Sequence, residues 1–218
     1  WTDAMTDAAD KASRQWASTR TGTVADIAET AADVLQLVYE PIVAPATAVL
    51  PPGMKDAPGQ WASGMFQTGW RSQNVYDKAL LPTTPIEISA LRFRRATNSA
   101  TVVPGRVNLR VSACATPNAP DHLSSVLDSN LTSGTVVVFS GDLTLGSPNS
   151  APWGTPNPFE LEIPFSTPFL FDPGLGHLLF EVRTYEGIAD LFVDNVLVLD
   201  RFFARVLTTD RFSLNLTA

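Results

Sequence analysis

The chain has one cysteine, two histidines and few charged residues for its length. Cys114 is the only cysteine among 218 residues, so an intrachain disulfide is excluded and a buried thiol is expected. Charged residues make up 17% of the chain, and the net charge of −7 gives a pI near 4.7. Binding to nucleic acid or to an anionic membrane surface depends on clustered Lys and Arg. We therefore expect no nucleic-acid partner. Because no apolar run approaches the ~20 residues of a membrane-spanning helix, we also expect no transmembrane segment.

Residues for catalysis and metal binding are equally sparse. His122 and His177 lie in no HExxH motif and in no Cys/His ligand spacing, and the chain has no G-x-S-x-G elbow. Glu160 and Glu162 share a strand face, as the two acids of a glycosidase could, but that face should be solvated. We expect a protein that is not an enzyme.

Oxygen ligands of the kind that calcium takes are present, but they are diffuse. Their spacing matches no EF-hand loop, so no cofactor is expected and calcium stays an alternative. These residues are Asp190, Asp194, Asn195 and Asp200.

Apolar residues, prolines and glycines are abundant. The hydrophobic content is 44%, with 17 prolines and 13 glycines, which is typical of a loop-rich all-β protein. After Gly59, short segments alternate apolar and polar residues with the period of strands. The predicted strands lie at residues 86–95, 106–113, 135–139, 159–165, 178–185, 191–199, 202–207 and 212–216. The sequence predicts a mainly β fold, an antiparallel two-sheet β-sandwich that is jelly-roll-like.

Two of these strands carry more detailed predictions. The segment 86–95 has Ile86 and Ile88 on one face but Leu91 and Phe93 on the other, so it should bulge near Ser89. Its basic cluster, Arg92, Arg94 and Arg95, should form a solvated face. The β-branched run 135–139 predicts a strand buried on both faces.

An aromatic segment leads into the clearest turn of the chain. Phe165, Phe169 and Phe171 precede Asp172-Pro173-Gly174, where proline presets φ and glycine accepts a positive φ. In the next strand, 178–185, Leu178, Phe180 and Val182 should face the core, with Glu181, Arg183 and Tyr185 opposite. Function on such a fold usually lies in long loops, here 116–133 and 146–158. In the second loop, Trp153 is the candidate contact for a sugar ring or another partner, or it covers the sandwich edge.

The first 58 residues predict a different organisation. Helical spacing predicts helices at 2–19 and 24–39, and recurring prolines predict an extended segment at 41–59. We expect an N-terminal helical and Pro-rich arm at 1–58 and a sandwich domain at 59–218. The arm either packs on its own domain or contacts a neighbouring subunit. The candidate assembly contacts are the apolar residues Val24, Ile27, Leu35, Val38, Ile42 and Val43.

Four segments together resemble a family of secreted bacterial β-sandwich surface proteins of the exosortase-sorted (PEP-CTERM-type) or planctomycete-like kind. They are GMFQTGWRSQNVYDKALL (64–81), PIEISALRFRR (85–95), TVVVFSGDLTL (135–145) and PFLFDPGLGHLLFEVR (168–183). The resemblance covers about residues 66–217 and implies an extracellular or cell-surface location and a structural or adhesive role. It brings no catalytic residues.

The resulting hypothesis is a non-catalytic, secreted structural protein that self-assembles with copies of itself or with other surface proteins. A carbohydrate-binding module using the Trp153 loop, with a glycan as partner, is the first alternative. A viral or phage coat or decoration protein is the second, on fold analogy alone.

Overall fold

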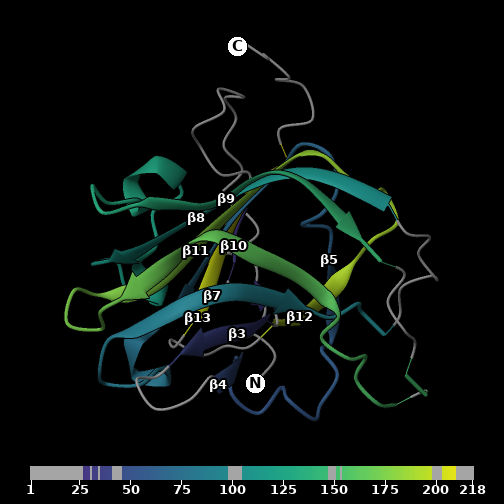
Figure 1. The fold of residues 1–218 in the computed structure, drawn as a ribbon, viewed down its shortest axis with the longest axis horizontal. Helices are drawn as coiled ribbons and strands as arrows, with labels where there is room; N and C mark the ends of the chain where they lie inside the picture. Colours follow the sequence, from purple (N-terminus) through teal and green to yellow (C-terminus); the bar gives the residue numbers. More distant parts are fainter. Residues whose placement is uncertain are drawn as a thin grey trace, which may run out of the picture.

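The protein is mainly β, with antiparallel sheets (Figure 1). The computed structural model describes residues 27–29, 31–33, 35–40, 46–97, 105–146, 151–152, 154–197 and 203–209. The largest sheet has the order β1 (Ile27–Glu29), β13 (Phe203–Thr209), β6 (Trp70–Tyr76), β11 (His177–Glu186), β8 (Gly105–Thr116) and β9 (Val136–Leu145). A second sheet has the order β10 (Leu161–Phe171), β7 (Ile86–Phe93), β3 (Leu35–Glu40) and β4 (Ala46–Leu50). The third has the order β2 (Ala31–Asp33), β12 (Val193–Leu197) and β5 (Trp61–Ser63). The described 3-10 helices are η1 (Lys78–Leu80), η2 (Pro120–His122) and η3 (Leu127–Asn130).

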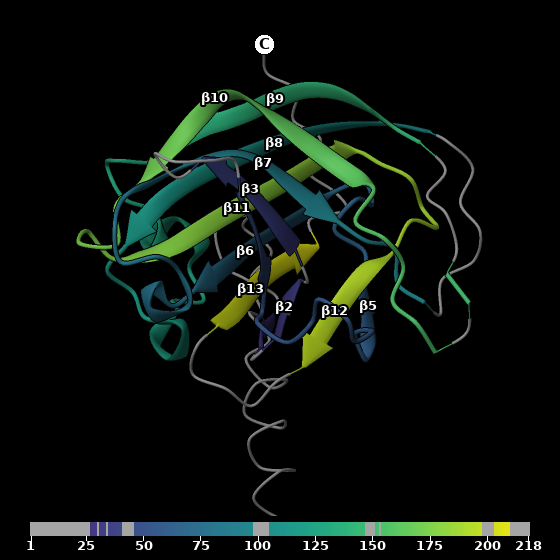
Figure 2. The same cartoon turned by 60° about the horizontal axis from the view of Figure 1, so that its bottom comes forward.

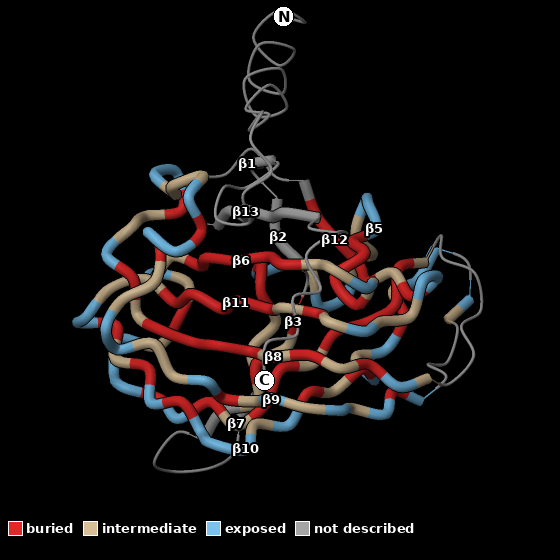
Figure 3. Tube along the Cα trace, turned by 90° about the horizontal axis from the view of Figure 1, so that it is seen from above, coloured by how far each residue is buried: buried red, intermediate tan, exposed pale blue. Residues whose placement is uncertain are grey.

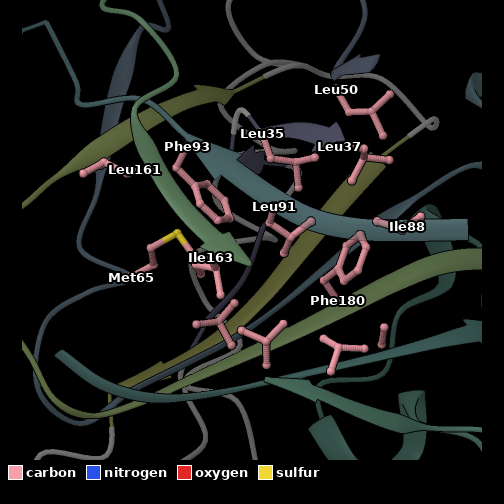
Figure 4. Close-up of a cluster of buried hydrophobic side chains, with 14 of the residues drawn as sticks. Leu35, Leu37, Leu50, Met65, Ile88, Leu91, Phe93, Leu161, Ile163 and Phe180 are labelled. Atoms are coloured by element: carbon pink, nitrogen blue, oxygen red, sulfur yellow. The ribbon is translucent and has the colours of Figure 1, made fainter. Parts of the chain in front are cut away.

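The two larger sheets lie against each other and enclose the main core (Figure 2). Alternate residues of each strand point inward, so Leu91 and Phe93 of β7 meet Phe180 of β11 and its neighbours (Figure 4). Burial of each such side chain stabilises the fold by about 1.5–3 kcal/mol. At one side, β9 and β10 run next to each other, and the Ser166 hydroxyl donates to the Val138 carbonyl at 3.0 Å.

The predicted bulge in the strand that begins at Ile86 is confirmed. Along β7, Ala90 pairs with Val38 of β3, but the next pair is Ile88 with Tyr39, so Ser89 has no opposite residue. The extra residue shifts the alternation by one position. Ile88 and Leu91, which an unbroken strand would place on opposite faces, are therefore both buried.

The predicted helix at 24–39 is wrong for the part that the structure describes. Ile27–Glu29, Ala31–Asp33 and Leu35–Glu40 are strands. Leu35 and Leu37 are both buried, and β3 is hydrogen-bonded to β7 on one side and β4 on the other (Figure 4). The apolar residues of this segment fit the period of a helix, but Leu35 and Leu37, two residues apart, also fit the period of a strand. Hydrogen bonding to two neighbouring strands then overrides the local helix propensity. Residues on both sides of position 58 thus contribute to the same sheet.

The proline-rich segment packs on its own chain where it is described. Leu50 lies in the core, and the carbonyls of Lys55 and Ala57 accept hydrogen bonds from the Arg94 guanidinium at 3.4 and 2.5 Å. The Gly59 N–H donates to Asp194 Oδ2 at 2.8 Å. A Cβ at position 59 would lie 2.3 Å from Asp194 Oδ1, so only glycine fits this contact.

The expected solvated face of Arg92, Arg94 and Arg95 is wrong for two of the three residues. Arg94 is fully buried and Arg95 nearly so, while Arg92 is partly exposed and pairs with Glu162 at 2.5 Å. Arg94 and Arg95 directly follow β7, which ends at Phe93. Here the 51–59 segment lies over Arg94, and Arg95 pairs with Val193 of β12. Alternation within one strand could not reveal these covering segments.

Arg94 and Asp194 form a buried ion pair at the centre of this region. Arg94 Nε donates to Asp194 Oδ2 at 2.7 Å, and the guanidinium lies over the Phe159 ring at 5.0 Å. Burial raises the pKa of the Asp194 carboxyl, and the Gly59 N–H and Arg94 oppose this shift. The free-energy cost of removing both charges from water offsets much of their attraction, so the pair adds little net stability. We infer that it instead fixes how β7, β12 and the 51–59 segment pack together.

The turn at Asp172-Pro173-Gly174 is confirmed, with Leu175 N–H donating to Asp172 O at 3.0 Å. It does not close a hairpin, because β10 belongs to the four-stranded sheet and β11 to the six-stranded sheet. The turn therefore carries the chain across the core. Gly176, at φ +146°, lies so close to Thr116 O that a Cβ would approach it to 2.3 Å.

The run 135–139 was predicted to be buried on both faces, but β9 is the outer strand of its sheet among the described residues, and Val137 is exposed. Its branched residues favour any strand, and position in the sheet decides burial. The predicted strand at 212–216 and the predicted helix at 2–19 lie outside the described residues.

Candidate anion-binding site

The outer face of β6, β11 and β8 carries three side-chain rows, set by the antiparallel register. Val75, Leu179 and Cys114 form an apolar row, and Gln73, Glu181 and Ser112 form a polar row beside it. Arg71, Arg183 and Arg110 form the third row, which we call the arginine row. Neighbouring strands lie about 4.8 Å apart, so the arginine row spans about 10 Å.

The 117–135 loop covers the apolar row. Leu123 and Leu131 of this loop pack against Val75, Cys114 and Leu179 in a small second core. Cys114 is a buried free thiol, as predicted. The loop was expected to carry function, and it forms one wall of the site described below.

Glu181 is the central group of the polar row. Its side chain is buried, although the alternating pattern placed it on the outer, half-exposed side of the strand. Figure 3 shows that β6 and β11 are buried along most of their length. Glu181 accepts from Arg71 Nε and Nη2 at 3.0 and 2.7 Å, from Gln73 Nε2 at 2.7 Å and from Arg183 Nε at 3.0 Å. These four donors satisfy the charge of the buried carboxylate.

The same network holds the covering loop in place. Gln73 also donates to the carbonyl of Leu127 at 2.9 Å and accepts from Asn130 Nδ2 at 3.0 Å. Asn130 is buried, and its side chain bonds the backbone of Ser124: Nδ2 donates to the Ser124 carbonyl, and Oδ1 accepts from the Ser124 N–H. Asn130 is therefore inaccessible as a glycosylation acceptor in the folded protein, although Asn130-Leu131-Thr132 matches the sequon.

Three arginines directly opposite one another repel, so the row needs anions. Glu181 compensates from within the sheet, and Asp128 of η3 compensates from the loop, with Oδ1 2.5 Å from Arg71 Nη2 and 3.8 Å from Arg183 Nη2. Within the row itself three cations face two carboxylates, which leaves one positive charge in excess there, while Asp142 and Glu186 lie beside the row, opposite Asn108. The side chains of Arg71, Arg183 and Arg110 are 8%, 30% and 34% exposed, so the excess charge lies toward Arg183 and Arg110.

The electrostatics of Asp128 reflect this excess. The Arg71 hydrogen bond is the largest cause that lowers the pKa of the Asp128 carboxyl; burial opposes it, and the charges of Arg71, Arg183 and Arg110 lower the pKa further. Asp128 therefore stays ionised on the arginine row at any ordinary pH. The row can hold and orient an oxyanion.

The sequence favoured no catalytic role for the histidines or for Glu162, and each of them has an ion-pair partner outside the arginine row. His122 is exposed and pairs with its neighbour Asp121 at 2.8 Å. His177 Nδ1 lies 3.6 Å from Asp77 Oδ2 at the start of β11. Glu162 pairs with Arg92 on the outer face of the other sheet, where the alternation predicted it.

The predicted contact residues are placed as follows. Leu35 is a core residue, and Val38 is partly exposed within β3 between two strands. Ile27 lies in β1, paired with β13. Trp153, Val24, Ile42 and Val43 lie outside the described residues.

Within the described ranges, no group of three His, Cys, Asp or Glu side chains is placed to hold a metal ion. Asp194, one of the calcium candidates, is occupied by Arg94 and Gly59. No described helix has the length and apolar character needed to cross a bilayer.

Sequence reasoning missed the arginine row. It placed Arg183 on the polar side of its strand, but Arg71 and Arg110 come from strands more than 70 residues away, and only the register aligns them. The sequence does show arginines on the polar sides of several predicted strands. It does not show which strands are neighbours, and that information is needed to predict the row.

Fold and site together define a mainly β protein of antiparallel sheets with a cationic row on the outer face of its largest sheet. No family model, curated protein or solved structure matches the chain. The resemblance to secreted bacterial surface proteins therefore stays a prediction.

Proposed function

We propose that the protein is a non-catalytic, jelly-roll-like β-sandwich that works by binding an anionic partner, as a structural component of a bacterial cell surface or extracellular assembly. The arginine row supports this proposal, because it presents spare cationic donors on a rigid sheet. Recognition by Arg needs no proton transfer, and arginine does not lose its proton in proteins.

The chemistry of the neighbouring groups favours binding over catalysis. Glu181 is buried and accepts four hydrogen bonds, three of them on Oε2, so a ligand approaching from solvent does not reach it. Asp128 has a lowered pKa and is a poor general base. Such a cluster can attract and position an anion, but it offers no group suited to moving a proton.

The structure removes part of the argument for assembly through residues 1–58. The sequence predicts Leu35 on a helical stripe that contacts a neighbouring subunit, but Leu35 lies in the core of its own chain. We therefore assign partner contact to the outer face of the six-stranded sheet, with a surface polymer or another surface protein as the partner.

The test is retention of the full chain on immobilised polyanions, with neutral dextran as the reference. We expect retention on at least one polyanion and its loss as NaCl rises from about 0.01 M to about 1 M, which shortens the Debye length from about 30 Å to about 3 Å. Arg110→Gln combined with Arg183→Gln should abolish retention. Equal behaviour on polyanions and dextran would refute binding, and hydrolysis that depends on His122 or Glu162 would refute a non-catalytic role.

A further inference from the structure

Asp128 shows that the arginine row accepts a carboxylate. Its Oδ1 sits 2.5 Å from Arg71 Nη2 and 3.8 Å from Arg183 Nη2, while the side chain remains 53% exposed. A planar carboxylate matches the planar guanidinium, which can present two parallel N–H donors to it. The chain itself thus supplies one ligand of this chemistry, from a loop that lies over one end of the row.

The other end of the row has unused donors. Arg110 makes no hydrogen bond that involves another described residue, and its Nε is buried without an acceptor among them. Its closest anion is Glu181, with Arg110 Nη2 4.0 Å from Oε1. Arg183 uses its Nε on Glu181, and its nearest other acceptor, Asp128, is 3.8 Å away. The Arg110 side chain is 34% exposed, so the terminal N–H groups of its guanidinium remain accessible to an incoming oxyanion.

Groups beside Arg110 indicate what else the ligand carries. Ser140 of β9 lies opposite Arg110 and is exposed, and the next pair along the two strands is Asn108 with Asp142. Asn108 Nδ2 donates to Asp142 Oδ1 at 2.8 Å, which leaves further acceptor capacity on that carboxylate. This surface offers hydroxyl, amide and carboxylate groups in turn. Sugar hydroxyls can both donate to and accept from such groups, whereas the ionised side chains of an acidic peptide can only accept.

We infer that Arg110 and Arg183 bind the carboxylate of an acidic sugar within a polysaccharide, with Ser140, Asn108 and Asp142 contacting its hydroxyls. This assignment rests on the proposed anion-binding function and narrows it to one ligand class. Asp128 competes with the ligand, because it places a negative charge on the same row. The flat outer face of a sheet suits a chain of linked sugars, which could extend along β8 and β9.

The experiment measures binding of the full chain to polygalacturonate, free galacturonate, heparin, polyglutamate and dextran by titration calorimetry at low salt. We expect polygalacturonate to bind best and free galacturonate to bind the same site more weakly. Arg110→Gln should weaken polygalacturonate binding roughly tenfold or more. Asp128→Asn should strengthen it, by roughly fivefold, because a competing charge is removed.

Matched variants separate recognition from general charge and from folding. Arg92→Gln removes an arginine of the same exposure, 35% against 34%, from the other sheet, and should leave binding unchanged. Arg110→Lys keeps the positive charge but lacks the paired N–H donors of the guanidinium. It should therefore bind more tightly than Arg110→Gln but more weakly than the parent. Thermal unfolding of each variant checks that the fold is intact, and Arg183→Gln provides a second test if Arg110→Gln does not fold.

The outcomes distinguish the two levels of the proposal. Stronger binding of heparin or polyglutamate than of polygalacturonate overturns the acidic-sugar assignment but leaves anion binding in place. Equal affinity for free galacturonate and the polymer identifies a small-acid site and overturns the polysaccharide. Binding that is unchanged in Arg110→Gln and Arg183→Gln overturns the site, and binding to none of the polyanions overturns the proposed function as well.

Discussion

The buried pair of Arg94 and Asp194 allows a quantitative test of the structure. Both side chains are almost inaccessible, at 0% and 1% exposure, and their contact is 2.7 Å long. Asp194→Asn keeps the shape of the side chain but removes its charge. The Arg94 guanidinium would then have neutral partners only, namely the amide oxygen of the new side chain, the carbonyls of Lys55 and Ala57 and the Phe159 ring.

Breaking one side of a buried pair typically costs about 3–5 kcal/mol, because an uncompensated charge stays inside the protein. That is a large part of the about 5–15 kcal/mol that stabilises an ordinary domain. With an m-value of about 2 kcal/mol per M of urea, the unfolding midpoint should fall by about 2 M. Replacing both residues, Arg94→Met with Asp194→Leu, should cost less than Asp194→Asn, since no buried charge remains.

Urea unfolding followed by tryptophan fluorescence measures these differences. The control is Glu162→Gln, which breaks the exposed pair of Arg92 and Glu162 and should change stability by less than about 1 kcal/mol. If Asp194→Asn is no more destabilising than Glu162→Gln, the pair is not buried and the packing of the 51–59 segment over Arg94 is wrong.

Two other predictions address the corrected strand and the loop. Leu35→Ala should lower the free energy of unfolding by about 2–5 kcal/mol, because it leaves a cavity between the sheets; a melting temperature that stays at the parent value would return Leu35 to a surface contact. Asp128 should titrate below its ordinary pKa of 3.8 in a carbon-13 NMR titration, and Arg71→Gln should raise that midpoint. Because the pKa is lowered by folding, the stabilisation from Asp128 is complete above pH 3.8 and is lost as the pH falls through the folded-state value. A midpoint that is unmoved by Arg71→Gln would contradict the 2.5 Å contact.

Local features of the sequence were enough to predict the strands and some of their irregularities. The alternation of apolar residues determines which face of β11 meets the core, since a strand has a side-chain period of two. The shift of that alternation in residues 86–93 required an extra residue, and it lies at Ser89. Asp172-Pro173-Gly174 specifies a turn because proline presets φ, although the positive φ expected of Gly174 is found at Gly176 instead.

Only the tertiary structure decided what lies beside and above each strand. Leu35–Glu40 carries apolar residues that suit a helix or a strand, and pairing with β7 and β4 selects the strand. Arg94 sits where alternation predicts a solvated side chain, but the 51–59 segment covers it and Asp194 neutralises it. The arginine row exists because the antiparallel register brings Arg71, Arg183 and Arg110 together from three separate parts of the chain. Strand order and register depend on the packing of the whole core, so no local pattern contains them.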